Sequence, residues 1–398
     1  MNVGVFLECK SPESGGGYSL QTDIFQSFVE IADESRHNFV VFCNYKQPKT
    51  QEVLKSRGIK KILYLSPNLI DRGVSILKRE FSQFRKYWKR PSRLERIAYR
   101  EGVEFMWFID QRPVLVDLPY LTILLDLQHC LQPWFPEVSS KGGWDHRESA
   151  FSWFLRRASL IITGNEAGRA EIERFYQVPT ERIKILPHPT PKFALNMPSS
   201  DGKEVLDKYD IPNGYLFYPA QFWPHKNHAN LLLSVRKLRD EFKLAFPVVF
   251  VGSDKGNQRY IKKLVDQLDL STQVFFLGFI PSNDLVSIYR NAFALTYVTF
   301  FGPENLPPLE AFALGCPVIA SNVPGAKEQL GEAAILVNPK NTREIAFAIK
   351  SLYDDSELRR TLIQRGFNRA IKWTGQDFVR GVFSMLDDFE SIRHCWGR

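Results

Sequence analysis

The chain contains 398 residues, of which 44% are hydrophobic and 24% are charged, as in an ordinary folded globular protein. This composition excludes extended disorder, collagen-like repeats and a disulfide scaffold for most of the chain, and the length indicates about two or three domains. No apolar run reaches the roughly 18 residues of a transmembrane helix, so we expect none. The first residues lack the basic and small-residue patterns of a signal peptide, and we expect none of these either.

The first half of the chain alternates short β-rich apolar runs with helical patterns. Two of the predicted helices are Leu20–Ile31 and Ala167–Phe175. Strands that alternate with helices are typical of parallel sheets covered by helices on both faces. The predicted strands are Val3–Leu7, Phe39–Cys43, Lys61–Tyr64, Phe105–Phe108, Leu121–Leu125, Leu160–Thr163 and Ile183–Leu186.

The second half repeats this alternation, and a segment rich in Pro, Ser, Asn and Gly separates the halves. We therefore predict an α/β chain with doubly wound parallel-sheet domains at residues 1–190 and 214–375, a linker at 191–213, and a C-terminal helix at 376–398 that packs back on the first domain. Ligands are expected in the cleft between two such domains, at the carboxyl ends of the strands. The predicted elements are helices Ala229–Leu244, Tyr260–Leu268 and Asn283–Arg290, and strands Tyr215–Tyr218, Val248–Val251, Val274–Leu277, Ala294–Tyr297, Pro317–Ala320 and Ala334–Val337.

Positive charge is concentrated in one segment. The net charge is +8, and Lys78–Arg100 holds nine basic and two acidic residues, a net of +7, with Phe81, Phe84, Tyr87 and Trp88 between them. Such a segment is typical of contact with an anionic membrane surface, and also of a solvated helix that packs its aromatic side chains on the domain. Contact with nucleic acid is a weaker third interpretation.

The cysteines indicate a reducing compartment. Their number is odd and no two have C-x-x-C spacing, which argues against a disulfide framework and a zinc site. We expect a cytoplasmic protein with buried or incidental thiols. The five are Cys9, Cys43, Cys130, Cys316 and Cys395.

The most informative segment is FFGPENLPPLEAFALGCPVIASN at residues 300–322. A predicted strand runs into a loop, a helix starts near Pro307 and ends at Gly315, and a short strand follows. The N-terminus of this helix is expected to offer unpaired N–H groups to a phosphate. Glu310 lies about one turn into the helix, where a carboxylate can accept both hydrogens of a ribose diol, although a glutamate there often only complements the helix dipole.

This segment resembles the signature of the family-4 retaining glycosyltransferases, which have the GT-B fold of two Rossmann-like domains. Their usual pattern is Glu-x7-Glu followed by a Gly-(Cys/Thr)-Pro-Val strand. The resemblance implies that Glu310 binds the nucleotide ribose and that Asn305 and Leu306 help to hold the sugar and the diphosphate. Gly302 occupies the first Glu position, so Glu304 is the candidate catalytic carboxylate that replaces it, in a loop that resembles a variant of the family.

A second segment, YPAQFWPHKNH at residues 218–228, follows the first predicted strand of the second domain. The family usually has Gly-Arg-x4-Lys here, with both cations on the donor diphosphate. The resemblance therefore assigns Lys226 to the diphosphate and places Gln221 at the arginine position, where an amide donates a hydrogen bond without a charge. His225 and His228 have i, i+3 spacing, but no third ligand is evident, so we expect no metal.

A third segment, LLDLQHCLQPWFPEV at residues 124–138, follows an apolar strand and is expected at the edge of the first sheet, facing the cleft. In the family, a histidine of the matching loop contacts the sugar near the reaction centre, and many members carry His-Asp there. The resemblance therefore implies catalytic roles for His129 and Asp126. A lone histidine is by itself more often a structural residue.

Two further loops carry weaker signals. Gly15, Gly16 and Gly17 follow the first strand, where the resemblance implies a loop near the diphosphate and the acceptor, and a plain strand–helix turn is the alternative. Phe279 follows a predicted strand end where the family reads the nucleotide base through backbone groups. No phosphate-binding P-loop, nucleophile elbow or metalloprotease motif occurs, and no Asp-x-Asp follows a strand, so we expect neither a cofactor nor a metal.

The residues and the resemblance together predict a hexosyltransferase that moves a sugar from a nucleotide-diphosphate donor to a glycan or polyprenol-linked acceptor. The subgroup resemblance implies surface polysaccharide or O-antigen synthesis, with mannose from GDP-mannose as the first candidate. The segment Lys78–Arg100 fits an acceptor at the inner face of the plasma membrane, and we expect no nucleic acid. The rival interpretations are a nucleotide-sugar-binding protein without transferase activity and a nucleic-acid-binding protein.

Overall fold

The computed structural model describes residues 1–7, 15–43, 48–63, 91–111, 116–196 and 202–397. These residues form two compact units. Most of the basic segment, residues 78–90, lies outside the described residues. Unit 1 comprises Met1–Trp134, Val138–Pro187 and Gly375–Arg398, and unit 2 comprises Phe135–Glu137 and His188–Thr374.

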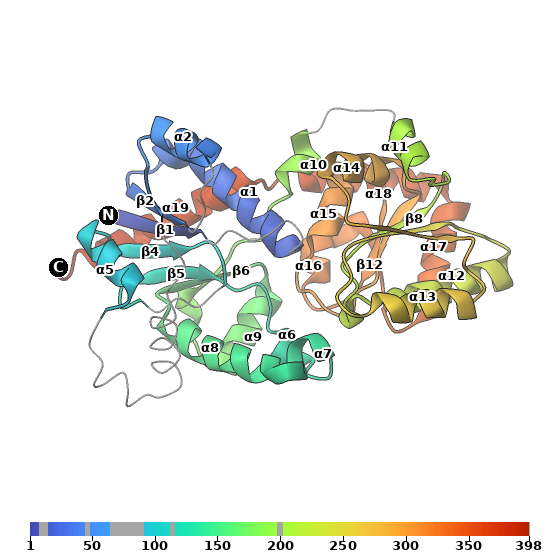
Figure 1. Ribbon diagram of the computed structural model, residues 1–398, viewed down its shortest axis with the longest axis horizontal. Helices are drawn as coiled ribbons and strands as arrows, with labels where there is room; N and C mark the ends of the chain where they lie inside the picture. Colours follow the sequence, from blue (N-terminus) through green and yellow to red (C-terminus); the bar gives the residue numbers. More distant parts are fainter. Residues whose placement is uncertain (8–14, 44–47, 64–90, 112–115, 197–201, 398) are drawn as a thin grey trace. The chain divides into compact units, whose positions relative to one another are not determined.

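Unit 1 is built on a sheet of seven parallel strands in the order β3-β2-β1-β4-β5-β6-β7 (Figure 1). The first strand lies inside the sheet and the chain builds outward from it in both directions, which is the doubly wound topology. The strands are β1 (Asn2–Leu7), β2 (Asn38–Cys43), β3 (Lys60–Leu63), β4 (Phe105–Phe108), β5 (Tyr120–Ile123), β6 (Leu160–Thr163) and β7 (Ile183–Ile185).

Helices cover both faces of this sheet. Within β4, Trp107 packs against Phe28 of α1, whereas Phe108 packs against Phe154 of α8. Successive strand residues point to opposite faces, so a strand covered on both sides reads as an unbroken apolar run. The helices are α1 (Gly16–Ile31), α2 (Pro48–Ser56), α5 (Arg93–Arg100), α6 (Gln128–Leu131), α7 (Pro136–Ser139), which spans the boundary of the two units, α8 (Gly143–Arg157), α9 (Glu166–Tyr176) and α19 (Gly375–Arg393).

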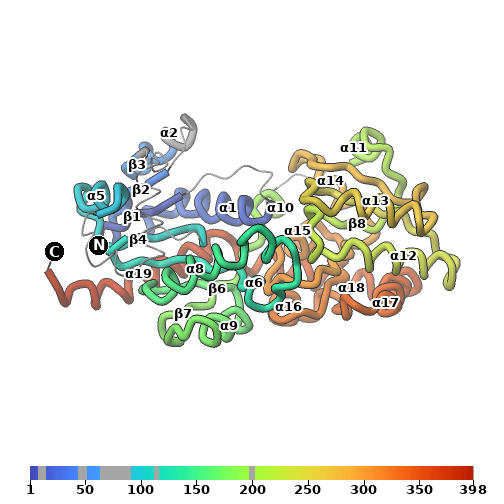
Figure 2. The backbone as a smooth tube through the Cα atoms, turned by 60° about the horizontal axis from the view of Figure 1, so that its bottom comes forward, coloured from blue at the N-terminus to red at the C-terminus, as the bar shows by residue number. Residues whose placement is uncertain are grey.

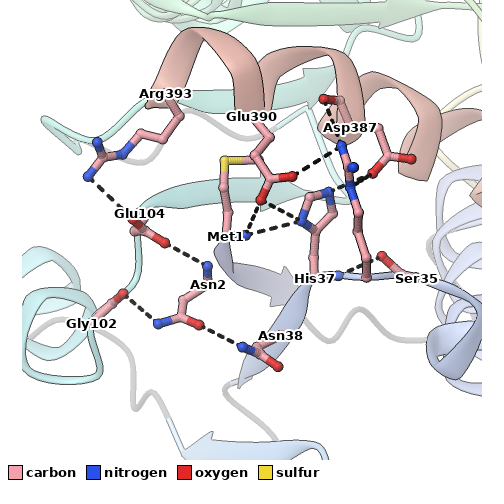
Figure 3. Close-up of polar contacts among 11 residues, drawn as sticks. Met1, Asn2, Ser35, His37, Asn38, Gly102, Glu104, Asp387, Glu390 and Arg393 are labelled. Carbon is pink, nitrogen blue, oxygen red and sulfur yellow. Dashed lines mark hydrogen bonds and ion pairs between the residues drawn. The ribbon is translucent and has the colours of Figure 1, made fainter. Parts of the chain in front are cut away.

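The C-terminal helix α19 belongs to unit 1 and packs along α1. Its acidic side chains contact residues that precede β1 and β2. Glu390 lies 2.8 Å from the amino group of Met1, and Asp387 lies 3.2 Å from the imidazole of His37 (Figure 3). Arg393 lies 3.4 Å from Glu104, the residue before β4. These contacts attach α19 to unit 1, although it follows unit 2 in the chain.

Unit 2 contains a second parallel sheet, of six strands in the order β10-β9-β8-β11-β12-β13. Figure 2 traces the backbone of this unit and labels β8 together with helices such as α12, α15 and α18. Its strands are β8 (Leu216–Pro219), β9 (Val248–Val251), β10 (Val274–Gly278), β11 (Ala294–Tyr297), β12 (Val318–Ser321) and β13 (Ala334–Val337). Its helices are α10 (Lys192–Asn196), α11 (Lys203–Lys208), α12 (His228–Phe242), α13 (Gln258–Gln267), α14 (Ser282–Asn291), α15 (Leu306–Ala313), α16 (Ala326–Leu330), α17 (Thr342–Asp354) and α18 (Ser356–Ala370).

The predicted strands all occur, and their ends differ from the predicted ones by at most two residues. The predicted linker differs from an open connection, because it contains the helices α10 and α11. Leu206 and Ile211 from this segment are buried in the core of unit 2. Within the described ranges, Cys43, Cys130, Cys316 and Cys395 are free thiols. None of the described helices combines the length and the apolar character needed to cross a membrane.

Candidate functional site

The predicted donor residues gather on loops that leave one edge of the sheet in unit 2. Strands β8 and β11 are parallel neighbours, so the loops that follow them emerge at the same carboxyl edge. The loop after β8 carries Gln221 and Lys226, and the loop after β11 leads into α15, which carries Glu310. This edge is where open α/β sheets bind ligands.

Lys226 is held in place by the neighbouring strand. Its ammonium nitrogen donates a 3.0 Å hydrogen bond to the hydroxyl of Tyr297, at the end of β11, and lies 5.4 Å from the centre of that ring. The backbone carbonyl of Lys226 accepts a hydrogen bond from the hydroxyl of Tyr218. The next residue, Asn227, donates to the carbonyl of Val298 at 2.7 Å. The lysine therefore stands on a loop that both strands fix.

The backbones of the two loops are also joined to each other. The carbonyl of His225 accepts hydrogen bonds from the backbone N–H of Phe300 at 2.8 Å and from the hydroxyl of Thr299 at 3.1 Å. Thr299 and Phe300 lie just after β11, separated from its last residue by Val298 alone. Because these bonds are within one unit, the positions of Lys226 and of the segment before α15 are set together.

Gln221, at the position where the family has arginine, has an oriented amide. Its oxygen accepts a 3.0 Å hydrogen bond from the indole N–H of Trp223, and its nitrogen donates to the hydroxyl of Ser253 at 3.3 Å. These two hydrogen bonds fix the orientation of the Gln221 amide, which is a neutral hydrogen-bond donor. It supplies no positive charge, so Lys226 is the one cation that the matched motif places on this loop.

Glu310 is buried near the start of α15. Its side chain accepts a 2.6 Å hydrogen bond from the hydroxyl of Tyr289, which lies on α14. Burial, followed by the charge of Glu310, raises the pKa of Tyr289 well above its usual value, so this phenol remains a hydrogen-bond donor. The tyrosine fixes the orientation of the carboxylate that we predicted to bind ribose. Tyr289 was missed from the sequence because no spacing rule connects it to Glu310.

The glycine at the first Glu position is required by the backbone. Gly302 has a φ of 137°, and a Cβ atom there would lie 2.5 Å from the side-chain oxygen of Asn305. The amide of Asn305 donates a 2.9 Å bond to the carbonyl of Gly302, which closes the turn. Any side chain at this position would displace Asn305, so the loop is built around the glycine.

The N-terminus of α15 offers fewer hydrogen-bond donors than we predicted. The second and third helical residues, Pro307 and Pro308, have no N–H group. The backbone N–H of Asn305 donates to the side chain of Gln329 at 3.0 Å, and the amide nitrogen of Gln329 donates back to the Asn305 carbonyl at 2.9 Å. Only Leu306 and Leu309 supply N–H groups in the first turn, so the helix end contributes less to anion binding than a usual one.

Glu304 differs from the expectation that its carboxylate faces a sugar. Its side chain is only 3% exposed, and both of its oxygens accept the backbone N–H of His188, at 3.0 and 3.2 Å. Burial raises the pKa of Glu304 to about 8, and burial lowers the pKa of His188 to about 4. The Glu304 side chain therefore fixes the backbone at His188. His188 gave no signal in the sequence other than its place between two prolines.

Glu137 is a further residue that sequence analysis missed. Its carboxylate accepts the backbone N–H of His225 at 3.0 Å and contacts the His225 ring nitrogen Nδ1 at 2.5 Å. Phe135 stacks on Phe300, with ring centres 6.0 Å apart. The short segment Phe135–Glu137 is therefore part of unit 2 and supports the loop that carries Lys226. His228, in contrast, is a core residue stacked on Phe222.

In unit 1, His129 and Asp126 follow β5 as predicted, but their side chains have different surroundings. The His129 imidazole is fully buried, T-shaped against Phe151, and burial lowers its pKa. The expectation that it faces a ligand is not met in this structure, because no part of the ring is exposed. Asp126 is 28% exposed and lies 3.4 Å from the guanidinium of Arg147.

Phe279 takes the position expected of a loop residue, whereas only the first of the three glycines predicted as a loop lies outside helix α1. Gly15 has a φ of 77°, a left-handed value that glycine adopts without strain, and Gly16 and Gly17 begin α1. The turn after β10 also uses a left-handed glycine, Gly278, with a φ of 69°. Phe279 follows it and is 58% exposed. Its ring is therefore one of the large apolar groups open to solvent in unit 2.

Comparison with known proteins identifies relatives of this arrangement. Residues 205–369 match the sequence family described as "Glycosyl transferases group 1". The O-antigen chain mannosyltransferase B of Escherichia coli is 30% identical over 249 residues, which cover 61% of this chain and 64% of that protein. The O-antigen chain mannosyltransferase RfbU of Salmonella typhimurium is 26% identical over 50% of this chain and 52% of that protein. The matches thus span about half to two thirds of the length of these relatives.

A solved structure shows the same fold. Alr3699/HepE of Anabaena, crystallised in complex with UDP, has a TM-score of 0.69 at 16% identity, and the match covers 98% of this chain and 100% of that chain. Together with the parallel sheets of seven and six strands, this likeness confirms the predicted GT-B fold.

Proposed function

We propose that this chain, whose residues 205–369 belong to the glycosyl transferases group 1 family, moves a sugar from a nucleotide-diphosphate donor to an acceptor hydroxyl with retention of the anomeric configuration. The names of the two bacterial relatives support mannose as the sugar and O-antigen or a similar surface polysaccharide as the product. GDP-mannose is therefore the first donor to test. The observation that carries the proposal is Lys226, fixed by Tyr297 at the carboxyl edge of the sheet in unit 2.

In this proposal, unit 2 binds the donor. Lys226 pairs with the diphosphate, and Gln221 donates a neutral hydrogen bond to it. Glu310, oriented by Tyr289, accepts hydrogen bonds from the ribose hydroxyls. Asn305 and Leu306 line the start of α15 beside the sugar. The exposed position of Phe279 after β10 suits contact with the nucleobase.

The chemical step requires stabilisation of the leaving diphosphate. As the bond between the sugar carbon and the phosphate oxygen breaks, negative charge grows on that oxygen, and a fixed cation lowers the barrier. Lys226 supplies this charge and Gln221 a dipole. We propose that the departing phosphate oxygen accepts the proton of the attacking hydroxyl on the same face of the sugar, so that neither a protein nucleophile nor a metal is needed. This route accounts for retention.

The roles that we propose for Asp126 and His129 in unit 1 follow from the solvent exposure of their side chains. Asp126 is open enough to contact a hydroxyl of the sugar or the acceptor, and we keep it as the proposed polar contact. The buried His129 is assigned a positioning role, because it anchors the segment that carries Asp126. Gly15, Gly16 and Gly17 are proposed to let the backbone approach the acceptor or the diphosphate closely.

Glu304 is likewise assigned a positioning role in unit 2, because its buried carboxyl group holds the backbone at His188. The burial of the Glu304 side chain and the glycine at position 302 also support a second candidate function. In that function the protein binds a nucleotide sugar without transferring it. The two functions differ in one measurable respect: the second predicts donor binding with no product over a broad acceptor panel.

For location, we propose a cytoplasmic protein that contacts the inner face of the plasma membrane through Lys78–Arg100, with a glycan or polyprenol-linked acceptor. The net charge of +7 in this segment supports the proposal. Reversing the charges of Arg85, Lys86, Lys89 and Arg90 is expected to abolish binding to vesicles that contain anionic lipid. Unchanged vesicle binding by this variant would rule out the membrane role.

The transferase proposal is tested by transfer of labelled sugar from GDP-mannose and from UDP-glucose to the lipid fraction of membranes from a polysaccharide-producing bacterium. We expect transfer by the full chain, at least about 10-fold lower transfer by Lys226→Ala, and unchanged transfer by the control Lys203→Ala, an exposed lysine of the same unit. Donor binding without labelled product would instead favour the binding protein.

A further inference from the structure

Four side chains from three helices converge in unit 1 after β5. His129 and Cys130 lie on α6, Glu148 lies on α8, and Tyr176 is the last residue of α9. The imidazole nitrogen Nε2 of His129, the thiol sulfur, one carboxylate oxygen and the phenol oxygen face a common point. His129 Nε2, Cys130 Sγ and a Glu148 oxygen all lie within 4.8 Å of one another.

The six distances among these atoms are close to the edges of one tetrahedron. His129 Nε2 lies 3.2 Å from the Tyr176 oxygen, 3.3 Å from Cys130 Sγ and 3.4 Å from Glu148 Oε2. The sulfur lies 3.7 Å from the Tyr176 oxygen and 3.8 Å from Glu148 Oε2, and these two oxygens are 2.9 Å apart. A tetrahedral ion with bonds of about 2.1 Å to nitrogen and oxygen and about 2.3 Å to sulfur has edges of about 3.4–3.6 Å.

Hydrogen bonding accounts for only part of this arrangement. The hydroxyl of Tyr176 donates a normal bond to Glu148 at 2.9 Å. In contrast, His129 Nε2 has three neighbours at similar distances of 3.2–3.4 Å, and one nitrogen can form a well-directed hydrogen bond with only one of them. Three potential ligand atoms at nearly equal distances from one imidazole nitrogen are the pattern of ligands that share an ion.

We propose that His129, Cys130 and Glu148 form a zinc site in unit 1, with the Tyr176 hydroxyl at the fourth vertex. Thiolate, imidazole and carboxylate are the three ligand types that Zn²⁺ takes in proteins. The Glu148 side chain is 33% exposed, which gives the ion a path from solvent. The spacing of the chain concealed this site, because His129 and Cys130 are adjacent and the other ligands come from distant helices.

The ion would act on structure and not on the reaction. It would tie the short helix α6 to α8 and α9, and thereby fix the segment that begins at Asp126. The His129 ring is also held by Phe151, at 5.5 Å between ring centres. Among the residues that the structure describes, none is a hydrogen-bond partner of its Nδ1 atom. Without this second-shell bond, the affinity is expected to be about 10–100-fold below that of a fully supported site. The proposal goes beyond glycosyl transfer and does not depend on it.

Cobalt titration of the chelator-treated full chain tests the proposal. Co²⁺ replaces Zn²⁺ in such sites, and a bound thiolate produces charge-transfer absorption in the near ultraviolet together with visible bands of a tetrahedral ion. We expect these bands to saturate at one Co²⁺ per chain and to disappear when Zn²⁺ is added. Zn²⁺ alone should raise the melting temperature, because it binds the folded chain.

Cys130→Ser should remove the charge-transfer band and the thermal shift, whereas the control Cys395→Ser, at an exposed thiol next to His394, should retain both. Circular dichroism establishes that each variant is folded. Because Glu148 is partly exposed, Glu148→Gln keeps the test decisive if Cys130→Ser fails to fold, and should weaken cobalt binding at least 10-fold. The proposal is overturned if folded wild-type protein shows no saturable band, or if Cys130→Ser or Glu148→Gln binds cobalt as the wild type does.

Discussion

The ammonium group of Lys226 lies 3.0 Å from the hydroxyl of Tyr297, so the last residue of β11 sets the position of a cation on the loop after β8. The lysine follows β8 and the tyrosine ends β11, so residues from two parallel neighbouring strands together position one ammonium group. If Lys226 binds the donor diphosphate, the tyrosine positions it and the charge performs the binding. This separation of roles makes the two residues a useful pair for mutation.

Lys226→Ala is expected to weaken binding of a nucleoside diphosphate by about 10- to 150-fold, because a charge-assisted hydrogen bond contributes about 1.5–3 kcal/mol. Tyr297→Phe keeps the lysine and should weaken binding by less than Lys226→Ala. Isothermal titration with the preferred nucleotide measures both. Equal affinities for the wild type and Lys226→Ala would remove the lysine from the site.

Gln221→Arg restores the charge that the family usually has at this position. We expect it to tighten binding of the nucleoside diphosphate and to steepen its dependence on salt, since a second cation then faces the phosphates. Gln221→Met, which removes the amide without adding charge, is the control and should weaken binding. If Gln221→Arg leaves both the affinity and the salt dependence unchanged, residue 221 does not face the diphosphate.

Gly302→Ala is expected to destabilise unit 2 through both backbone strain and a clash with Asn305. Gly256→Ala is the matched control, because Gly256 also has a left-handed φ, 100°, but a Cβ there meets nothing within 4 Å. We expect a loss of about 1–2 kcal/mol for Gly256→Ala and about 1–3 kcal/mol more for Gly302→Ala. Urea unfolding measures both, and equal losses would show that the clash with Asn305 is relieved.

The buried Glu304 predicts a pH dependence of stability. Its pKa is raised to about 8 in the folded chain from an ordinary 4.5, so between these values the folded state holds a proton that the unfolded state has lost. The stability contribution therefore falls as the pH rises from about 4.5 to about 8, with a slope of up to ~1.4 kcal/mol per pH unit. Glu304→Gln, which stays neutral and still accepts the His188 N–H, should remove this slope.

The buried His188 contributes in the opposite direction at lower pH. Its pKa is lowered to about 4, so stability falls as the pH drops from about 6.5 toward 4. The Glu304→Gln test is therefore read between pH 6.5 and 8, by the urea midpoint of each variant. The control Glu332→Gln, at an exposed glutamate, should keep the wild-type slope. A wild-type slope in Glu304→Gln would show that this carboxyl group is ionised in the folded chain.

The strands could be predicted from sequence because parallel strands are buried on both faces. Phe105–Phe108 is such a run, and the structure has β4 at the same residues. The helices α10 and α11 could not, because Pro and Ser in the segment 191–213 indicate a linker while burial of Leu206 comes from tertiary packing. Amino-acid composition indicates the local preference for helix, strand or loop. It does not predict short helices that are stabilised by packing against a neighbouring core.

The candidate site, like the fold, could be predicted from the sequence only in part. The sequence motifs place Gln221 and Lys226 on the loop after one strand and Glu310 near the start of the helix after another, and the structure has them there. The hydrogen-bond partners that orient or bury the site side chains could not be predicted from the sequence. Glu304 and His188 are 116 residues apart in the chain, and Glu137 and His225 are 88 apart. Contacts at such separations leave no periodic signal in one sequence.

The most direct test of the account is a thermal-shift panel of UDP, GDP, ADP and their mannose and glucose derivatives on the full chain. A guanine nucleotide is expected to raise the melting temperature of the wild type by mass action. Glu310→Gln should lose this rise, and Tyr289→Phe, which keeps the carboxylate, should retain at least part of it. If no nucleotide stabilises the wild type, or if Glu310→Gln responds as the wild type does, unit 2 does not hold a nucleotide donor in the proposed way.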